Sequence, residues 1–508
     1  MEIRCVNFKI ESIFQIVYIF IKTNMDTLNQ DVLIEILSYL PQYDKIQSSS
    51  VCKLWNNINK YIYTTVYVKY ENFNCSSFKN WIKNKNVKIE LDCSYNYVDS
   101  FEIDGDIKKI VMQFCELETI PENIFQLKSL VHLNASVNSI LNISNNISCL
   151  SNLKELYLYK NELIDLPFEL SQLKKLEKLY LTFNNFEYIP ECVYHLENLK
   201  ELYISNNDIE FISNDIQLLS NLEILNIESN DLTFLPNSIF KLINLKTLFL
   251  NYNYIQIIPK EICKLQNLKT FLMDYNRVEY IPNSIGKLSN LKNFSMVGNM
   301  LTEIPDSIGN LTELRLLYLD CNKIIKLPNT IGKLKLLTEL GLNNNLLFEL
   351  PDSFTLLQNL IHLQLSYNYL QILPNSFGRL INLKELDISN NQLIFIPLSI
   401  GMLQKLKSFD LQNNMVKKLP HTIAFLSELV YLNLEMNSLA KIPKGIGFLE
   451  KMVHLNLRNN YIEHLPNTMN NMSRLKEVYI GGNEILVYPK YIKSAIISDE
   501  DDVHINFE

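Results

Sequence analysis

The 508-residue sequence lacks the patterns on which most enzymes and exported proteins depend. Glycine occurs only 12 times, and there is no phosphate-binding glycine loop, HExxH motif or serine–histidine–aspartate arrangement. The nine cysteines are scattered, odd in number and never spaced as CxxC. This usage predicts reduced thiols in a cytoplasmic or nuclear protein. We therefore expect no enzyme activity, no cofactor and no metal site.

Basic charge and long apolar runs are also scarce. The net charge is −8, and no basic face typical of a nucleic-acid-binding protein is obvious. The apolar run from Ile13 to Ile21 is too short to span a membrane, and no small-residue cleavage site follows it. Because Met25 stands directly before the next module, we expect residues 1–25 to be an extension outside the folded protein. The alternative is an extension that packs as a helix or a strand.

Proline, by contrast, is present at strictly regular positions. In steps of 23 residues from Pro121 to Pro489, 15 of the 17 positions are proline, and Ser144 and Ser213 are the exceptions. Six residues before each position stands an asparagine, except at Cys115. With its leucines, the pattern resembles the leucine-rich repeat, L-x-x-L-x-L-x-x-N/C-x-L, over about residues 107–497.

Each part of the repeat predicts a local structure. The alternating pair Leu156 and Leu158 places two apolar side chains on one face of a short strand. The threefold spacing of Leu170, Leu173 and Leu176 suits a 3₁₀ turn on the outer side. The asparagine can donate and accept at once, so we expect an internal asparagine ladder. The predicted fold is an α/β solenoid of about 17 repeats, a leucine-rich-repeat horseshoe with a parallel concave sheet.

Residues 26–62 predict three short helices, with Pro41 ending the first. The stretch resembles an F-box, although Asn29 stands where that family usually has proline. The matching residues are Leu28, Asp31, Val32, Ile36, Leu37, Leu40, Pro41, Asp44, Val51, Cys52 and Trp55. The resemblance implies that these residues, apart from Asp44, dock on the Skp-type adaptor of a cullin–RING ligase. The alternative is a helical bundle that only caps the solenoid.

The segments that flank the repeats are less regular. Residues 63–106 are expected to be a linker and an irregular capping repeat, with one strand in TTVYVKY and another in VKIELDCSYN. A short helix is predicted around Trp81, which we interpret as a core residue. Residues 498–508 are expected to form an acidic, solvated tail, with a closing cap of the stack as the alternative.

The concave face is where the repeats differ from one another. Its middle column begins aromatic and becomes acidic, so we predict a target-binding surface with a preference for basic partners. The predicted contact residues are Tyr157, Tyr159, Tyr180, Tyr203, Phe249, Asp274, Asp320, Asp387 and Asp410. The alternative is that the tyrosines reflect only β-propensity and composition. The histidines of this face, His132, His362 and His454, lie too many repeats apart to bind one metal ion.

Two functional hypotheses follow. In the first, which the F-box resemblance implies, the chain is the substrate-recognition subunit of an SCF-type ubiquitin ligase. The F-box would bind the adaptor and the solenoid would bind an unknown protein target, without nucleic acid or membrane. In the second, the LPxxIGxLxNL repeats resemble the Ras-group leucine-rich-repeat type. That resemblance implies a non-catalytic signalling scaffold that binds a small GTPase or a phosphatase.

Overall fold

The computed structural model describes residues 65–69, 88–95, 106–485, 489 and 496–497. The predicted F-box at 26–62, the predicted helix around Trp81 and the acidic tail lie outside these ranges. The chain divides into two compact units, Met1–Asn161 and Glu162–Glu508, and each is described by itself.

The first unit contains five parallel strands among its described residues. They are β1 (Thr65–Lys69), β2 (Lys88–Asp92), β3 (Ile107–Val111), β4 (His132–Asn134) and β5 (Glu155–Tyr157), and each pairs with the next. The register between β2 and β3 shifts at Ile89/Glu90. Two 3₁₀ turns, η1 (Glu122–Gln126) and η2 (Asn145–Cys149), follow β3 and β4. Both strands predicted between the F-box and the repeats are confirmed.

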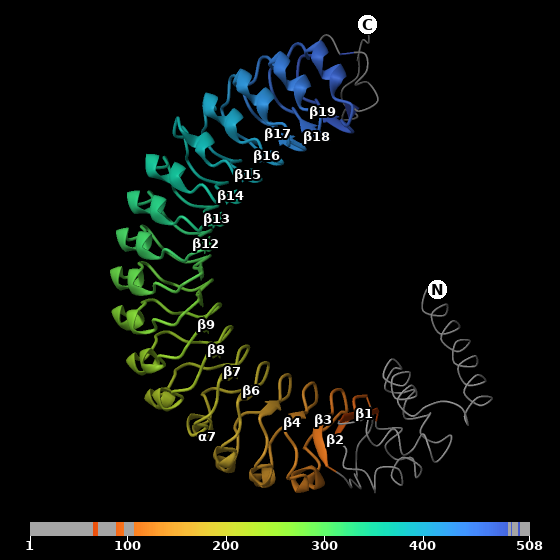
Figure 1. Ribbon diagram of the computed structural model, residues 1–508, viewed down its shortest axis with the longest axis vertical. Coiled ribbons are helices and arrows are strands. Elements are labelled where there is room, and N and C mark those ends of the chain that lie inside the picture. The colour runs from red at the N-terminus through yellow and green to blue at the C-terminus, as the bar shows by residue number, and fades with distance from the viewer. Residues whose placement is uncertain (1–64, 70–87, 96–105, 486–488, 490–495, 498–508) are drawn as a thin grey trace, which may run out of the picture. The chain divides into compact units, whose positions relative to one another are not determined.

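The second unit repeats a three-residue strand and a short outer turn (Figure 1). Its strands are β6 (Lys178–Tyr180), β7 (Glu201–Tyr203), β8 (Ile224–Asn226), β9 (Thr247–Phe249), β10 (Thr270–Leu272), β11 (Asn293–Ser295), β12 (Leu316–Tyr318), β13 (Glu339–Gly341), β14 (His362–Gln364), β15 (Glu385–Asp387), β16 (Ser408–Asp410), β17 (Tyr431–Asn433), β18 (His454–Asn456), β19 (Glu477–Tyr479) and β20 (Ile496–Ile497). Each strand from β6 to β19 is parallel to the next, and the register places each residue opposite the one 23 positions later, as in Thr270↔Asn293.

The outer turns of this unit are 3₁₀ helices with one exception. They are η3 (Phe168–Gln172), η4 (Asn214–Leu218), η5 (Asn237–Lys241), η6 (Lys260–Lys264), η7 (Asn283–Lys287), η8 (Asp306–Asn310), η9 (Asn329–Lys333), η10 (Asp352–Leu356), η11 (Phe377–Arg379), η12 (Leu398–Met402), η13 (His421–Phe425), η14 (Lys444–Phe448) and η15 (Asn467–Asn471). The exception is α7 (Glu191–Tyr194), a single α-helical turn. Within this unit the strands line the inner side of an arc and the turns its outer side (Figure 1). The threefold leucine spacing therefore predicted these turns correctly.

Proline and serine start the outer turns in different ways. Pro305, with φ −69° and ψ 148°, precedes η8 in an extended conformation and supplies no side-chain cap. Ser144 and Ser213 stand at the two positions without proline, and the Oγ of each accepts a backbone N–H two residues later, from Asn146 and Asp215. Proline favours the start of the turn because its ring fixes φ, whereas serine favours it through a capping hydrogen bond. This difference accounts for the two positions at which serine stands in place of proline.

The asparagine ladder is confirmed, and Asn299 shows its geometry. Its Nδ2 donates to the carbonyl oxygens of Met273 (2.9 Å) and Met296 (3.2 Å), and its Oδ1 accepts the N–H of Val278 (3.0 Å). The side chain is 7% exposed. One amide therefore pairs backbone groups of two successive repeats that would otherwise be buried without partners. The leucine columns, such as Leu248 and Leu250, are fully buried around this ladder.

Candidate binding face on the parallel sheet

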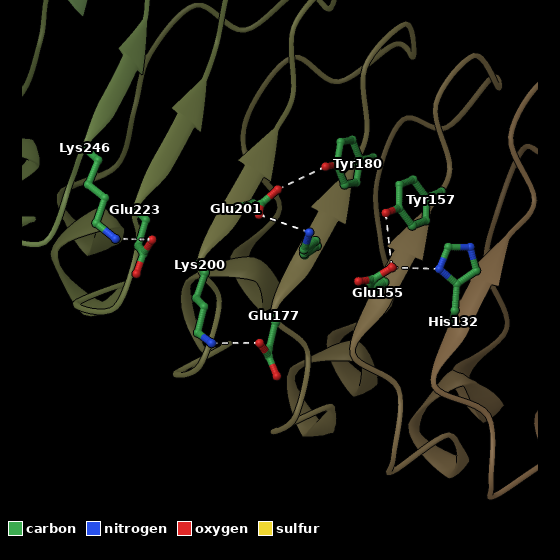
Figure 2. Close-up of polar contacts among 10 residues, drawn as sticks. His132, Glu155, Tyr157, Glu177, Tyr180, Lys200, Glu201, Glu223 and Lys246 are labelled. Carbon is green, nitrogen blue, oxygen red and sulfur yellow. Dashed lines mark hydrogen bonds and ion pairs between the residues drawn. The ribbon is translucent and has the colours of Figure 1, made fainter. Parts of the chain in front are cut away.

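The sheet face of the first unit carries a polar and aromatic cluster. The Tyr157 hydroxyl donates to Glu155 Oε2 (3.2 Å), and the same oxygen lies 2.8 Å from Nδ1 of His132 (Figure 2). The ring of His132 is 4.8 Å from that of Tyr157, and burial lowers the pKa of this histidine. Tyr159 accepts a hydrogen bond from Gln113 Nε2 (2.8 Å). Both predicted tyrosines are half-buried, and their hydroxyls are held by neighbouring side chains.

In the second unit, two predicted tyrosines stack directly. The rings of Tyr180 and Tyr203 are 4.4 Å apart and inclined by 7°. The Tyr180 hydroxyl donates to Glu201 Oε2 (3.1 Å), and the other oxygen of Glu201 is 3.2 Å from Lys178 Nζ (Figure 2). Phe249 is half-buried on β9, two strands from Tyr203. The sequence thus located an ordered aromatic pair, but it did not reveal the glutamate that fixes it.

The predicted aspartates have a structural role as well as a place on the face. Oδ1 of Asp274 accepts the N–H of Val297 (2.7 Å), and Oδ1 of Asp320 accepts that of Asn343 (2.8 Å). Asp387 and Asp410 accept backbone N–H groups two residues later in their own repeats, both at 2.9 Å. Burial raises the pKa of Asp274, Asp320 and Asp410 above the ordinary value. These carboxylates are therefore half-buried and hydrogen-bonded to the backbone.

A notch in the face lies where the middle column changes from aromatic to polar. A depression of about 300 Å³ lies beside β13, the strand that ends at Gly341. Its lining includes Tyr318, Glu339, His362 and Glu385. The Tyr318 hydroxyl bonds to Glu339, and His362 Nδ1 lies 2.8 Å from Glu385 Oε2. Sequence reasoning missed this notch, although a glycine in a column of larger side chains was the available signal.

The C-terminal edge of the strands adds aromatic residues that are not among the predicted contact residues. Tyr252 and Tyr275 stack with their rings 4.7 Å apart, and they are 56% and 48% exposed. The guanidinium of Arg277 lies 4.5 Å above the ring of Tyr254. Tyr252 and Tyr275 precede the ladder asparagines, a position that accepts many residue types, so nothing in the repeat pattern distinguished them.

The described residues provide no evidence for metal chemistry or a membrane span. They contain no group of three or more histidine, cysteine, aspartate or glutamate side chains placed to hold a metal ion. In the same part of the chain, every helix is too short or too polar to cross a bilayer. The predicted adaptor-binding residues, Leu28 to Trp55, lie outside the described ranges, and both predicted binding surfaces remain predictions.

Family models match most of the chain. A leucine-rich repeat region model matches residues 210–317 and 305–393, and a leucine rich repeat model matches 151–209, 174–232, 381–439 and 427–485. An F-box domain model matches residues 25–59. No protein with curated function matches the chain in a sequence comparison.

Solved structures share the repeat fold. A leucine-rich-repeat protein of Leptospira interrogans is 28% identical, with 87% of this chain and 96% of that chain covered and a TM-score of 0.56. The Arabidopsis receptor kinase HAESA, solved with the peptide hormone IDA and the co-receptor SERK1, is 22% identical over 84% and 78% of the two chains, with a TM-score of 0.64. An internalin of Listeria monocytogenes is 23% identical over 66% and 88%, with a TM-score of 0.52. The last two likenesses concern the fold alone.

Proposed function

Because the chain belongs to the F-box/leucine-rich-repeat proteins, we propose that it is the substrate-recognition subunit of an SCF-type ubiquitin ligase. The observation that carries the proposal is the F-box match at residues 25–59 ahead of repeats matched from 151 to 485. The F-box docks on a Skp-type adaptor, and the repeats hold a target protein while other subunits bring the ubiquitin-charged enzyme. The chain itself performs no chemistry.

The sheet face supports a target-holding role. Because equivalent residues of successive strands stand opposite one another, their side chains form rows with a spacing of about 4.8 Å. Such long rows suit an extended protein surface. The stacked pair Tyr180 and Tyr203 is held in place by Glu201, so little side-chain entropy remains to be lost on binding. The notch at Gly341, with Glu339 and Glu385 in its lining, provides a separate acidic recess. Together these features favour a protein target over a small molecule.

The decisive experiment is capture of the adaptor by the full chain. We expect the wild-type protein to co-purify with a Skp-type adaptor, and Leu40→Asp or Trp55→Ala to abolish the capture. Lys53→Ala is the matched control, because it lies between two matching residues without belonging to the pattern. Absence of the adaptor from the wild-type complex would reject the ligase role.

Mass spectrometry of the same complexes identifies the target. Replacing Tyr180 and Tyr203 by alanine should release the target and leave the adaptor bound, whereas Tyr461→Ala, at a 65% exposed tyrosine elsewhere, should release neither. Nucleotide-dependent capture of a small GTPase that survives deletion of residues 26–62 would instead support the Ras-group scaffold.

A further inference from the structure

A row of basic side chains lies on the edge of the sheet where the strands begin. Lys269, Lys292 and Arg315 directly precede β10, β11 and β12, and Lys384 and Lys407 directly precede β15 and β16. Lys405 lies two residues before Lys407. We call these six residues, all exposed except the half-buried Lys292, the basic edge.

Backbone hydrogen bonds hold this row in register. The N–H of Lys292 donates to the carbonyl of Lys269 at 2.8 Å, and the same bond recurs from each repeat to the next as far as Lys407. The side chains therefore start from fixed points one strand step apart, about 4.8 Å. Binding of a partner that matches this spacing therefore requires no further ordering of the solenoid backbone.

The charged nitrogens of the basic edge form no close ion pairs with the described carboxylates. Earlier in the same row, Lys200 pairs with Glu177 (2.8 Å) and Lys246 with Glu223 (2.6 Å), as Figure 2 shows. Within the described part of the chain, no carboxylate lies within 4 Å of a charged nitrogen of the basic edge. The basic edge is thus a positively charged region in a protein whose net charge is −8.

Three of the carboxylates near the basic edge have other partners, whereas Glu313, two residues before Arg315, is half-buried and forms no ion pair within 4 Å with the described residues. Glu339 and Glu385 immediately follow Thr338 and Lys384, but they belong to the concave face, where they contact Tyr318 and His362. Glu428, one repeat after Lys405, pairs with Lys451 (2.6 Å). The positive field of the basic edge is thus available to an external anion.

Two uncharged positions interrupt the row and open a depression. Thr338 and Ile361 occupy the positions that basic residues hold in the repeats before and after them. The depression there measures about 380 Å³, with Arg315 at one end, Lys384 and Lys405 at the other, and Leu336 and Ile361 as apolar lining. Lys405 Nζ donates to Asn382 Oδ1 (2.7 Å), which orients this lysine at the rim. The site therefore combines an apolar recess with cationic ends.

We propose that this depression binds an extended acidic segment of a partner protein, with two glutamate or aspartate residues four positions apart and an apolar residue midway between them. Arg315 and Lys384 are three strand steps apart, about 14 Å, and four residues of extended chain also span about 14 Å. In an extended segment, residues i, i+2 and i+4 point to the same side. The two carboxylates thus meet Arg315 and the Lys384/Lys405 pair while the apolar side chain enters the recess.

This inference does not depend on the F-box. The depression lies on the edge where the strands begin, and its lining shares no residue with the aromatic and acidic columns proposed to hold a target. An adaptor that failed to bind would leave it intact, and an acidic peptide that failed to bind would leave the ligase proposal intact. The two proposals can therefore fail separately.

The test uses the full chain and a fluorescently labelled nine-residue peptide with glutamates four positions apart, leucine midway and serine elsewhere. Fluorescence polarisation should show saturable binding that weakens with added salt. Glutamine in place of either glutamate should weaken binding roughly three- to tenfold, the range expected for losing an exposed ion pair with its hydrogen bond. Serine in place of leucine should weaken it similarly. Equal binding of all these peptides, or no binding, would overturn the proposal.

Variants of the protein separate this site from general attraction of anions. Arg315→Glu and Lys384→Glu should each weaken peptide binding about tenfold, while Lys287→Glu, at an exposed lysine of the outer turn η7, should not. Ile361→Lys is the sharpest test, because it adds a charge to the row but fills the apolar recess. It should weaken binding of the peptide, whereas a surface that attracts any polyanion, nucleic acid included, would bind more tightly. Circular dichroism melting curves confirm that each variant is folded.

Discussion

At the scale of single residues, the ladder asparagines were predictable and their neighbours were not. A buried amide at a fixed position in every repeat has one evident role, the pairing of orphaned backbone groups. The residue just before it adopts a left-handed conformation, as at Tyr252 (φ 54°) and Asn344 (φ 52°), at a cost of about 1–2 kcal/mol. Glycine at two of these positions and asparagine at five favour that conformation, but the other residues there do not, because the ladder imposes it on whichever residue precedes the asparagine.

Loss of one ladder asparagine should therefore be costly. Asn299→Ala removes the acceptor of the Val278 N–H and the donor to Met273 and Met296. We expect a loss of about 1–3 kcal/mol, seen as a lower urea midpoint by circular dichroism. The control is Asn290→Ala, because Asn290 also donates to a backbone carbonyl, that of Gln266, but at an exposed position. An equal loss in both variants would contradict the ladder's role.

Replacing a half-buried aspartate by asparagine should raise the stability of the protein at pH 7 rather than lower it. Because burial raises the pKa of Asp320, the folded state favours the protonated carboxyl, and stability is lost as the pH rises through the ordinary and then the raised pKa. Asp320→Asn keeps an oxygen that can accept the Asn343 N–H without ionising. It should unfold at a higher urea concentration than the wild type at pH 7, and the difference should vanish below the ordinary aspartate pKa.

Asp352→Asn, at an exposed aspartate of the outer turn η10, serves as the control and should leave the urea midpoint unchanged at both pH values. A wild-type protein more stable than Asp320→Asn at pH 7 would show that the charged carboxylate is favoured in the folded state. If Asp320→Asn is the more stable protein at pH 7, the ionised aspartate lowers the stability of the fold. An aspartate at such a position is consistent with a binding role for the acidic column.

At the scale of elements, the strands and outer turns follow from leucine spacing, but the closeness of successive turns does not. A β-carbon at Gly309 in η8 would lie 2.5 Å from the carbonyl oxygen of Thr330 in η9. The same position holds Phe240 and Tyr194 in earlier repeats. A column that accepts both glycine and large aromatic residues carries no single packing signal, so sequence reasoning had no basis for predicting this contact.

Gly309→Ala should consequently destabilise the array by about 1–3 kcal/mol, because the added methyl group must displace the backbone of the next turn. The matched variant is Ala424→Gly, which makes the reverse change at the equivalent position five repeats later and should cost no more than about 1 kcal/mol. Thermal melting followed by circular dichroism compares the two. A Gly309→Ala protein as stable as the wild type would mean that the turns can separate freely.

At the scale of the whole molecule, the repeat architecture was predictable because each unit contacts only its neighbours, so one 23-residue pattern specifies the array. The binding surfaces were only partly predictable. Tyr180 and Tyr203 could be placed on one face from their spacing alone. The recess between Arg315 and Lys384 depends on two positions, Thr338 and Ile361, that differ from the rest of their row, and its chemistry emerges only when strands from different repeats are placed side by side.

The same modular logic predicts that the solenoid folds without the F-box. Among the described strands the backbone ladder starts at β1, whose five residues pair with those of β2, so removing residues 1–62 leaves every described strand with its described neighbours. We expect the deletion to lower the melting temperature by less than about 2 °C, because roughly 1 kcal/mol shifts a domain of 150–250 residues by about 2–4 °C and a longer array by less. Adaptor capture should be lost completely. A much larger decrease would show that residues 1–62 cap the stack and contribute to its stability. That result would favour the helical-bundle interpretation of this segment, and adaptor capture by the full chain would then decide whether it also docks a ligase.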